Sequence, residues 1–171
     1  MQEFLYFAYG SNMLTARLNE RCPSAKPAGC AFAPGYRLIF EKLGRDGSGK
    51  AAIAPAAPGE QVSGVLFTIS RDDLPALDRA EWGYVRHDAF PVFAAGSPEP
   101  VRAVTYIAPR EICRIGLSPF DWYLALIKAG MREHGLAGEI SENHARIATI
   151  QDADRDRAAR MFSLCKGNDD I

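Results

Sequence analysis

The hydrophobic and polar positions near the start of the chain change abruptly from one pattern to another. Residues 3–9 (EFLYFAY) form a continuous aromatic and apolar run, which predicts a strand buried on both faces. From Asn12 to Pro23 the apolar positions recur at helical spacing, which predicts a short helix with Asn12 as its N-cap. A buried strand therefore leads through Gly10-Ser11-Asn12 into a helix.

Strand-like segments dominate the middle of the chain. Two candidate strands divided by a Pro-Gly pair lie within residues 29–43, and two more lie at residues 50–57 and 62–70. Glycines and charges between them, over residues 44–50, predict a flexible loop at the surface. A sheet is expected to accumulate from these segments.

The second half of the chain mixes both patterns. In order, it predicts a short helix over 70–81, strands over 84–95 and 101–109, an amphipathic helix over 118–135, and charged helices within 141–150 and 152–162. Ser118 and Pro119 are the expected N-cap and first residue of the amphipathic helix. Without strict strand–helix–strand repetition, this order predicts an α+β fold: a mixed sheet or barrel with helices packed around it.

Length and charge restrict the classes of function. A chain of 171 residues suits a single domain over 1–171, with a frayed tail over 165–171. Its 20 basic and 21 acidic residues leave a net charge of −1, which argues against nucleic acid and against an anionic membrane surface as partners. No apolar run approaches the roughly 20 residues of a membrane helix, and no leader pattern opens the chain. We therefore expect a soluble, cytoplasmic protein with a small-molecule ligand.

Cysteine and histidine positions do not suggest a metal site. The four cysteines form no C-x-x-C pair and have no histidine at ligand spacing, so reduced structural thiols and no metal are expected. The histidines are widely separated, and two of them fall in segments that predict solvated helix. These two are His134 and His144.

Gly10-Ser11-Asn12 is the first candidate for chemistry. Between a strand and a helix, successive backbone N–H groups can point at one spot and bind a carboxylate, a phosphate or a developing oxyanion. The alternative is that the three residues merely turn the chain and cap the helix. The segment does not match the phosphate-loop pattern G-x-x-x-x-G-K-[ST].

Glu81 is the second candidate, because it ends a predicted helix and precedes aromatic residues. Burial there would raise its pKa and make it a proton carrier near neutral pH, whereas the alternative is an ordinary charged residue at a helix end. Asp78, His87 and Asp88 are nearby rivals, each expected to be solvated. Tyr123 is expected to be a core aromatic residue whose hydroxyl needs a partner. Covalent catalysis has little support, since Ser11 has no G-x-S-x-G setting and no cysteine has a histidine partner.

Four segments, in order over about residues 4–150, together resemble the gamma-glutamylcyclotransferase family. The most specific is YFAYGSN within the first of them, because an aromatic strand leading into Gly-Ser-Asn is the family signature. The segments are FLYFAYGSNMLTARLNERCPSA, EQVSGVLFTIS, LPALDRAE followed by YVRHDAFPV, and SPFDWYLALIKAGMREHGL.

This resemblance implies a small barrel of mixed strands ringed by helices, with no metal and no organic cofactor. It implies a reaction that releases 5-oxoproline and a free amine from a gamma-glutamyl compound. Glu81, after the LD pair, maps onto the family's catalytic glutamate, and the family includes homodimers, which makes a homodimer one expectation. The implied substrate-binding residues are Tyr6, Phe7, Ala8, Tyr9, Gly10, Ser11, Asn12 and Tyr123.

Trp82 departs from the family pattern, because relatives usually carry glycine directly after the catalytic glutamate. Only Trp82 and Gly83 separate Glu81 from Tyr84, so the loop is expected to be short and bulky. Trp82 would narrow the entrance of the pocket or replace the contacts of a longer loop. Trp82 favours one alternative to catalysis, a module that binds a small molecule without turning it over. A second alternative is a phosphate or nucleotide binder that uses the backbone amides of Gly10-Ser11-Asn12, but the near-neutral charge and the lack of a phosphate-loop pattern argue against it.

Overall fold

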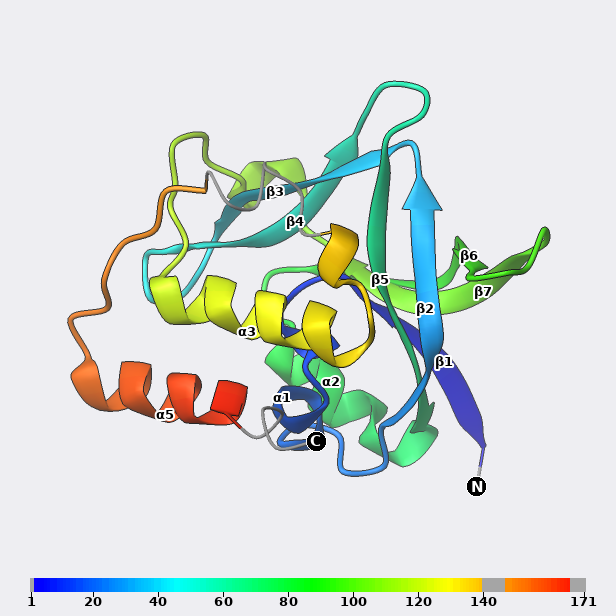
Figure 1. The fold of residues 1–171 in the computed structure, drawn as a ribbon, viewed down its shortest axis with the longest axis horizontal. Coiled ribbons are helices and arrows are strands. Elements are labelled where there is room, and N and C mark those ends of the chain that lie inside the picture. Colours follow the sequence, from blue (N-terminus) through cyan, green and yellow to red (C-terminus); the bar gives the residue numbers. More distant parts are fainter. Residues whose placement is uncertain (1, 140–146, 167–171) are drawn as a thin grey trace.

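A closed barrel of five strands lies at the centre of the computed structural model, which describes residues 2–139 and 147–166 (Figure 1). Neighbouring strands are antiparallel, except that β1 and β7 run parallel and close the barrel where Tyr6 lies opposite Val104. Around the barrel the order is β1 (Glu3–Ala8), β5 (Gln61–Ser70), β2 (Lys26–Pro34), β6 (Val85–Ala94) and β7 (Pro100–Ile107). The predicted combination of a mixed barrel and helices is confirmed.

β1 is buried on both faces, as its continuous apolar sequence predicted. Phe7 is fully buried and Tyr6 nearly so, although successive side chains of a strand point to opposite faces. β5 is antiparallel to β1 and places Phe67, also fully buried, opposite Tyr6. A buried Thr105 hydroxyl on β7 donates to the Phe7 carbonyl oxygen, so this buried polar group has a partner.

A two-stranded sheet of β3 (Tyr36–Leu43) and β4 (Gly49–Pro55) lies beside the barrel and forms no part of it (Figure 1). The connection between these strands was expected to be a flexible surface loop, and it is a loop in which Arg45 and Gly47 are exposed. Its other positions have partners inside the protein. Ser48 is buried, its amide and hydroxyl both donate to the Asp46 carboxylate, and Lys50 donates to that same carboxylate. These bonds connect the glycine-rich stretch to the start of β4.

Helices cover the barrel on the side of the N-terminal turn. α3 packs on η1 and α5 packs on α3 (Figure 1). Gly130 makes the first contact close, since a Cβ there would lie only 2.5 Å from the backbone nitrogen of Leu14. The helical elements are η1 (Ser11–Met13), α1 (Thr15–Asn19), η2 (Arg71–Asp73), α2 (Leu74–Ala80), η3 (Arg110–Ile112), α3 (Asp121–Glu133), η4 (Ala137–Glu139) and α5 (Arg155–Cys165).

The start of α3 differs from the prediction. The helix begins at Asp121 with Phe120 in extended conformation as its N-cap, rather than at Pro119 with Ser118 as the cap. Ile150 is the reason: its N–H donates to the Pro119 carbonyl oxygen, and its own carbonyl oxygen accepts from the Asp121 N–H. Pairing with a distant segment thus keeps this stretch extended.

Of the charged helices predicted near the C-terminus, the one within 152–162 is confirmed as α5 (Arg155–Cys165). Asp154 accepts a hydrogen bond from the Arg157 N–H at the start of α5, as an N-cap side chain does. The helix expected over 141–150 lies mostly outside the described residues, and the described end of it, residues 147–150, is not helical. His144 and the last five positions of the expected tail, residues 167–171, also lie outside them.

The described residues contain neither a membrane-spanning helix nor a group of metal ligands. Across 2–139 and 147–166, no helix is long and apolar enough to cross a membrane. In the same residues, no three His, Cys, Asp or Glu side chains gather in a way that would hold a metal ion. All four cysteines are free thiols.

Candidate active site

A cavity of about 830 Å³ opens where the N-terminal turn, the end of α2, the β3–β4 sheet, α3 and α5 meet. Phe7 and Ala8 do not line it, because both lie in the core with almost no exposed surface. The other residues expected to be catalytic or substrate-binding all line it: Tyr6, Tyr9, Gly10, Ser11, Asn12, Glu81 and Tyr123. Segments from the beginning, middle and end of the chain therefore share one cavity.

The turn after β1 is tighter than predicted. Met13 N–H donates to the Gly10 carbonyl oxygen and Leu14 N–H to that of Ser11, which closes a 3-10 turn, and the α-helix starts only at Thr15. Asn12 is therefore not the N-cap of this helix. The N–H groups at the start of such a turn receive no acceptor from the turn itself, which leaves those of Ser11 and Asn12 for another partner beside the cavity.

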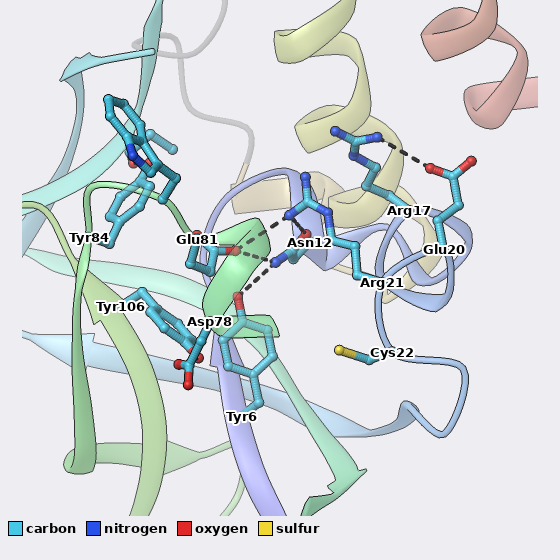
Figure 2. Close-up of polar contacts among 12 residues, drawn as sticks. Tyr6, Asn12, Arg17, Glu20, Arg21, Cys22, Asp78, Glu81, Tyr84 and Tyr106 are labelled. Carbon is cyan, nitrogen blue, oxygen red and sulfur yellow. Dashed lines mark hydrogen bonds and ion pairs between the residues drawn. The ribbon is translucent and has the colours of Figure 1, made fainter. Parts of the chain in front are cut away.

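The Asn12 side chain instead joins three elements (Figure 2). Its Nδ2 donates to Glu81 Oε1 over 2.6 Å and to the Tyr6 hydroxyl over 2.9 Å. Its Oδ1 accepts from the Arg21 guanidinium over 2.7 Å. Both ends of the amide are occupied, so its orientation is fixed with the nitrogen toward Glu81.

Glu81 lies at the C-cap of α2, with its N–H bonded to the Leu77 carbonyl oxygen and its side chain only 13% exposed. Burial raises the pKa of this carboxyl above its ordinary value. The Arg21 guanidinium, 3.5 Å away, most strongly opposes that rise, followed by the hydrogen bond from Asn12 and the charge of Lys42. A carboxylate of this kind can accept and return a proton closer to neutral pH than an exposed glutamate can.

Tyr123 on α3 meets the turn and β4 at one point. Its hydroxyl accepts from the Ala51 N–H over 3.1 Å, which supplies the partner that a buried tyrosine needs. Gly10 lies against the same pair, since a Cβ on Gly10 would lie 3.2 Å from the Ala51 Cβ and 3.5 Å from the Tyr123 hydroxyl. The turn after β1 therefore packs closely against β4 and α3 at this point.

Further tyrosines complete an aromatic wall around Glu81. The Tyr9 hydroxyl donates to the Tyr106 carbonyl oxygen, and the Tyr84 hydroxyl donates to that of Ala51 over 2.7 Å. Burial raises the pKa of Tyr9 and Tyr84 well above the ordinary value, with the Glu81 charge adding to the effect. These phenols stay protonated and act as hydrogen-bond donors.

None of the rivals to Glu81 lines the cavity. Asp78 accepts from the Tyr106 hydroxyl over 2.6 Å and from Arg86, while Asp88 pairs with the same arginine at the surface. His87 is exposed on β6. Asp78 and Asp88 thus have structural partners outside the cavity.

His134 is a correction, since it was expected on solvated helix surface. Its ring nitrogen Nε2 lies 3.0 Å from the Met13 carbonyl oxygen and 3.3 Å from the Thr15 hydroxyl, and its side chain is 10% exposed. The ring also meets Phe67 edge-on. His134 therefore secures the end of α3 to the N-terminal turn.

Several basic residues at the cavity were missed. Arg17 and Arg21 lie at helical spacing directly after the Gly-Ser-Asn segment, a signal that could have been read from the sequence. Lys42, Lys50 and Arg157 come from β3, β4 and α5, and no local pattern connects them with Glu81. All five line the cavity.

Comparison with known proteins identifies the family. The family model described as "Gamma-glutamyl cyclotransferase, AIG2-like" matches residues 6–145, which is most of the chain. The chain belongs to the gamma-glutamylcyclotransferase family. The human gamma-glutamylcyclotransferase is 31% identical over 152 residues, covering 82% of this chain and 77% of the human protein. The bovine gamma-glutamylcyclotransferase is 30% identical over 139 residues, covering 79% and 73%.

A solved structure supports the same assignment at the level of the fold. A gamma-glutamyl cyclotransferase that is 26% identical superposes with a TM-score of 0.79 and covers 93% of this chain and 99% of its own. The range matched by the gamma-glutamylcyclotransferase family model contains the turn after β1, Glu81 and Tyr123. Arg157 on α5 lies beyond it.

Proposed function

We propose that this protein cyclises a gamma-glutamyl amide to 5-oxoproline with release of a free amine, with Glu81 as general base and then acid. One observation carries the proposal: Glu81 is largely buried at the cavity, and its Oε1 accepts from Asn12 of the signature turn over 2.6 Å. A proton acceptor and a set of backbone donors are thus held side by side. Membership of the family supports this reading.

The substrate itself supplies the nucleophile in this reaction. The alpha-amine nitrogen attacks the gamma-carbonyl carbon, a new C–N bond closes the ring, and the bond to the departing amine breaks. Effective molarities of well-oriented intramolecular reactions reach about 10⁵ to 10⁸ M. A cavity that folds the substrate onto itself therefore accounts for much of the acceleration without an enzyme nucleophile.

Glu81 moves the proton in this mechanism. Its carboxylate takes a proton from the substrate ammonium, which frees the nitrogen lone pair for attack. The same carboxyl donates that proton to the nitrogen of the departing amine as its bond to the gamma-carbon breaks. The ring nitrogen then releases its second proton to solvent as the lactam forms, so that the products are 5-oxoproline, the neutral amine and one proton. General acid–base catalysis of this kind contributes about 10² to 10⁴-fold, and the burial that raises the pKa of Glu81 suits it for both steps.

The turn after β1 holds the glutamyl moiety in this proposal. The N–H groups of Ser11 and Asn12 lie ahead of the turn's own hydrogen bonds and would donate to the substrate carboxylate or to the developing oxyanion. The Tyr6, Tyr9 and Tyr123 rings would enclose its aliphatic part. Phe7 and Ala8, which are core residues, would act only by supporting the turn.

The charge around the cavity favours a departing amine that carries a carboxylate. Eight lining residues are Lys or Arg and four are Asp or Glu, whereas the whole chain has a net charge of −1. Such a basic cavity attracts anions. We therefore infer gamma-glutamyl amino acids or peptides as substrates in preference to gamma-glutamyl polyamines.

Incubation with a panel of gamma-glutamyl compounds, followed by chromatographic detection of 5-oxoproline, tests the proposal. The panel contains a gamma-glutamyl amino acid, a gamma-glutamyl peptide and a gamma-glutamyl polyamine. We expect 5-oxoproline from the first two in excess of the third. Thermal stabilisation by these compounds without any 5-oxoproline would overturn catalysis and favour the alternative, a binding module on the same fold.

A further inference from the structure

Arg45, Trp82, Lys42 and Tyr84 form a cation–aromatic stack at one side of the cavity. The Lys42 ammonium lies 4.8 Å from the ring centroids of both Trp82 and Tyr84. The Arg45 guanidinium lies 4.6 Å from the centroid of the same Trp82 ring. Cations at such distances from aromatic faces are attracted to them. Lys42 is only 3% exposed, which is rare for a lysine and indicates a specific role.

The Lys42 side chain supports the backbone that follows Glu81. Its Nζ donates to the Trp82 carbonyl oxygen over 2.8 Å, within a turn that the Tyr84 N–H closes by donating to the Glu81 carbonyl oxygen. Gly83 has a φ of +81°, and a Cβ added to it would lie 3.3 Å from both Cε and Nζ of Lys42. Gly83 therefore allows the chain to turn directly after Trp82, and its backbone packs against the Lys42 side chain.

Support from outside the helix matters because α2 ends before Glu81. The backbone of Glu81, with φ −88° and ψ 39°, has left the helical conformation. Lys42 comes from β3, and Tyr84 is fixed by its hydroxyl to Ala51 on β4. In Figure 2 the Tyr84 side chain lies on the opposite side of Glu81 from Asn12 and Arg21. The β3–β4 sheet therefore supports the turn formed by residues 81–84 on one side, and the N-terminal segment contacts Glu81 on the other.

Lys42 also supplies positive charge to Glu81. Burial lowers the pKa of Lys42, and the Glu81 carboxylate is the strongest opposing influence on it. Within the described residues Lys42 forms no salt bridge, so its charge acts on Glu81 through space. The other charged groups that act on Lys42 are Asp46, Lys50 and Arg45. The other ionisable groups that share an electrostatic interaction with Glu81 are Arg17, Arg21, Cys22, Tyr6, Tyr9, Tyr84, Tyr106 and Tyr123.

We propose that Lys42 is a positioning residue for the reaction proposed above: it fixes the Trp82–Tyr84 turn and supplies charge to Glu81 from the β3 side. The part of this inference that concerns catalysis rests on the proposed function. Its structural and electrostatic parts concern the free protein and have readouts that need no turnover.

The experiment compares Lys42→Met, Lys42→Gln and Lys42→Arg with the matched control Lys26→Met, which removes an exposed lysine of β2. Glutamate labelled with ¹³C at the side-chain carboxyl reports the titration of Glu81, assigned by the loss of its signal in Glu81→Gln. The two indole N–H signals of Trp82 and Trp122, assigned with Trp82→Phe, report the turn. Where a substrate is confirmed, kcat and KM are measured as well.

We expect Lys42→Met to raise the pKa of Glu81, because a positive charge that favours its carboxylate is lost. The same variant should move the Trp82 indole signal and leave that of Trp122 unchanged. Lys42→Gln, which keeps a donor without the charge, should raise the pKa with a smaller change of the indole signal. Lys42→Arg, which keeps the positive charge, should leave the pKa of Glu81 close to that of the wild type, and Lys26→Met should change neither the titration nor the indole signal.

In turnover we expect Lys42→Met to lower kcat by about 10- to 100-fold, since small misplacements of reacting groups have effects of this size. KM should change less.

Glu81 titrating as in the wild type in both Lys42→Met and Lys42→Gln would overturn the proposal. If Lys42→Met fails to fold, Lys42→Gln carries the same test of charge. Absence of 5-oxoproline from every gamma-glutamyl compound would overturn the proposed function instead, and the titration and indole readouts would still decide the part played by Lys42.

Discussion

Asn12 Nδ2 donates to Glu81 Oε1 over 2.6 Å and so joins the turn after the first strand to the end of α2 (Figure 2). The two residues are 69 positions apart in the chain. Because Arg21 and Tyr6 hold the same amide, its nitrogen stays directed at the carboxylate. The candidate proton carrier is thereby held beside the segment proposed to bind the glutamyl moiety.

Glu81→Gln should remain folded and lose turnover. The amide oxygen of glutamine can still accept from Asn12, while the group no longer takes up a proton. We expect kcat for 5-oxoproline formation to fall by about 10² to 10⁴-fold, with the melting temperature close to that of the wild type. Glu99→Gln, at an exposed turn position, is the control. A rate near that of the wild type in Glu81→Gln would show that another group moves the proton.

Asn12→Asp should shift the pH dependence of the reaction. A carboxylate beside Glu81 and the loss of the Nδ2 donor both disfavour the charged form, so both raise the pKa of Glu81 further. If Glu81 must be deprotonated to start the cycle, the acidic limb of kcat/KM against pH moves to higher pH. Asn19→Asp, exposed at the end of α1, should leave the limb in place. An unchanged limb in Asn12→Asp would contradict Glu81 as the base.

Tyr123→Phe should lower stability, because it removes the hydroxyl that accepts from the Ala51 N–H and forms a hydrogen bond with the Ser11 side chain. The Ala51 N–H then faces a buried site without its acceptor, and leaving such a donor unpaired costs about 1 to 3 kcal/mol. Urea unfolding measures the change. Tyr36→Phe is the matched control, because the described residues show no hydrogen bond to the half-buried Tyr36 hydroxyl, and it should change the free energy of unfolding by less than about 0.5 kcal/mol. Equal effects of both variants would show that the hydrogen bonds of the Tyr123 hydroxyl contribute nothing to stability.

Asp152→Asn should loosen α5 from α3 at neutral pH. Asp152 is buried, accepts from the Trp122 indole over 2.8 Å and binds the Arg157 guanidinium at two nitrogens. These charge-assisted bonds suggest a loss of roughly 2 kcal/mol in urea unfolding at pH 7. Asp156→Asn, on the exposed first turn of α5, is the control and should cost a few tenths of a kcal/mol at most, by roughly the helix-dipole effect.

Asp152→Asn should lower the free energy of unfolding by less in acid than at pH 7. The Arg157 guanidinium is the main cause that holds the pKa of Asp152 far below its ordinary value. A depressed folded-state pKa means that the carboxylate stabilises the fold above the unfolded pKa of about 4. That contribution is lost as the pH falls from there through the folded-state pKa. The difference between wild type and Asp152→Asn should therefore shrink between pH 4 and pH 2, and a constant difference would contradict the assignment.

Local patterns predicted the strands and most helices because burial of a face leaves a periodic trace in the sequence. The strand predicted over 62–70 is β5 (Gln61–Ser70), and the helix predicted over 70–81 is η2 followed by α2, ending at Ala80. The start of α3 was wrong because Ile150 pairs with the backbone of Pro119 and Asp121. No pattern around Pro119 contains that partner.

The candidate site was predictable only in part, for a related reason. Gly10-Ser11-Asn12 and Glu81 stood out by their positions between elements and at a helix end, whereas the charged residues that surround them at the cavity did not. Lys42 reads as one charge on a strand, yet it lies almost fully buried beneath the turn after Glu81. His134 reads as solvated, yet it binds the Met13 carbonyl oxygen.

By itself, the sequence determined the order and kind of the elements, the apolar positions of the barrel and the family to which the chain belongs. These depend on residues close together in the chain, whose spacing reports which side of an element is buried. Only the tertiary structure decided that Asn12, Arg21, Glu81 and Lys42 meet at one cavity. Their contacts are set by how the barrel, the β3–β4 sheet and the helices pack, and packing over such separations leaves no periodic trace along the chain.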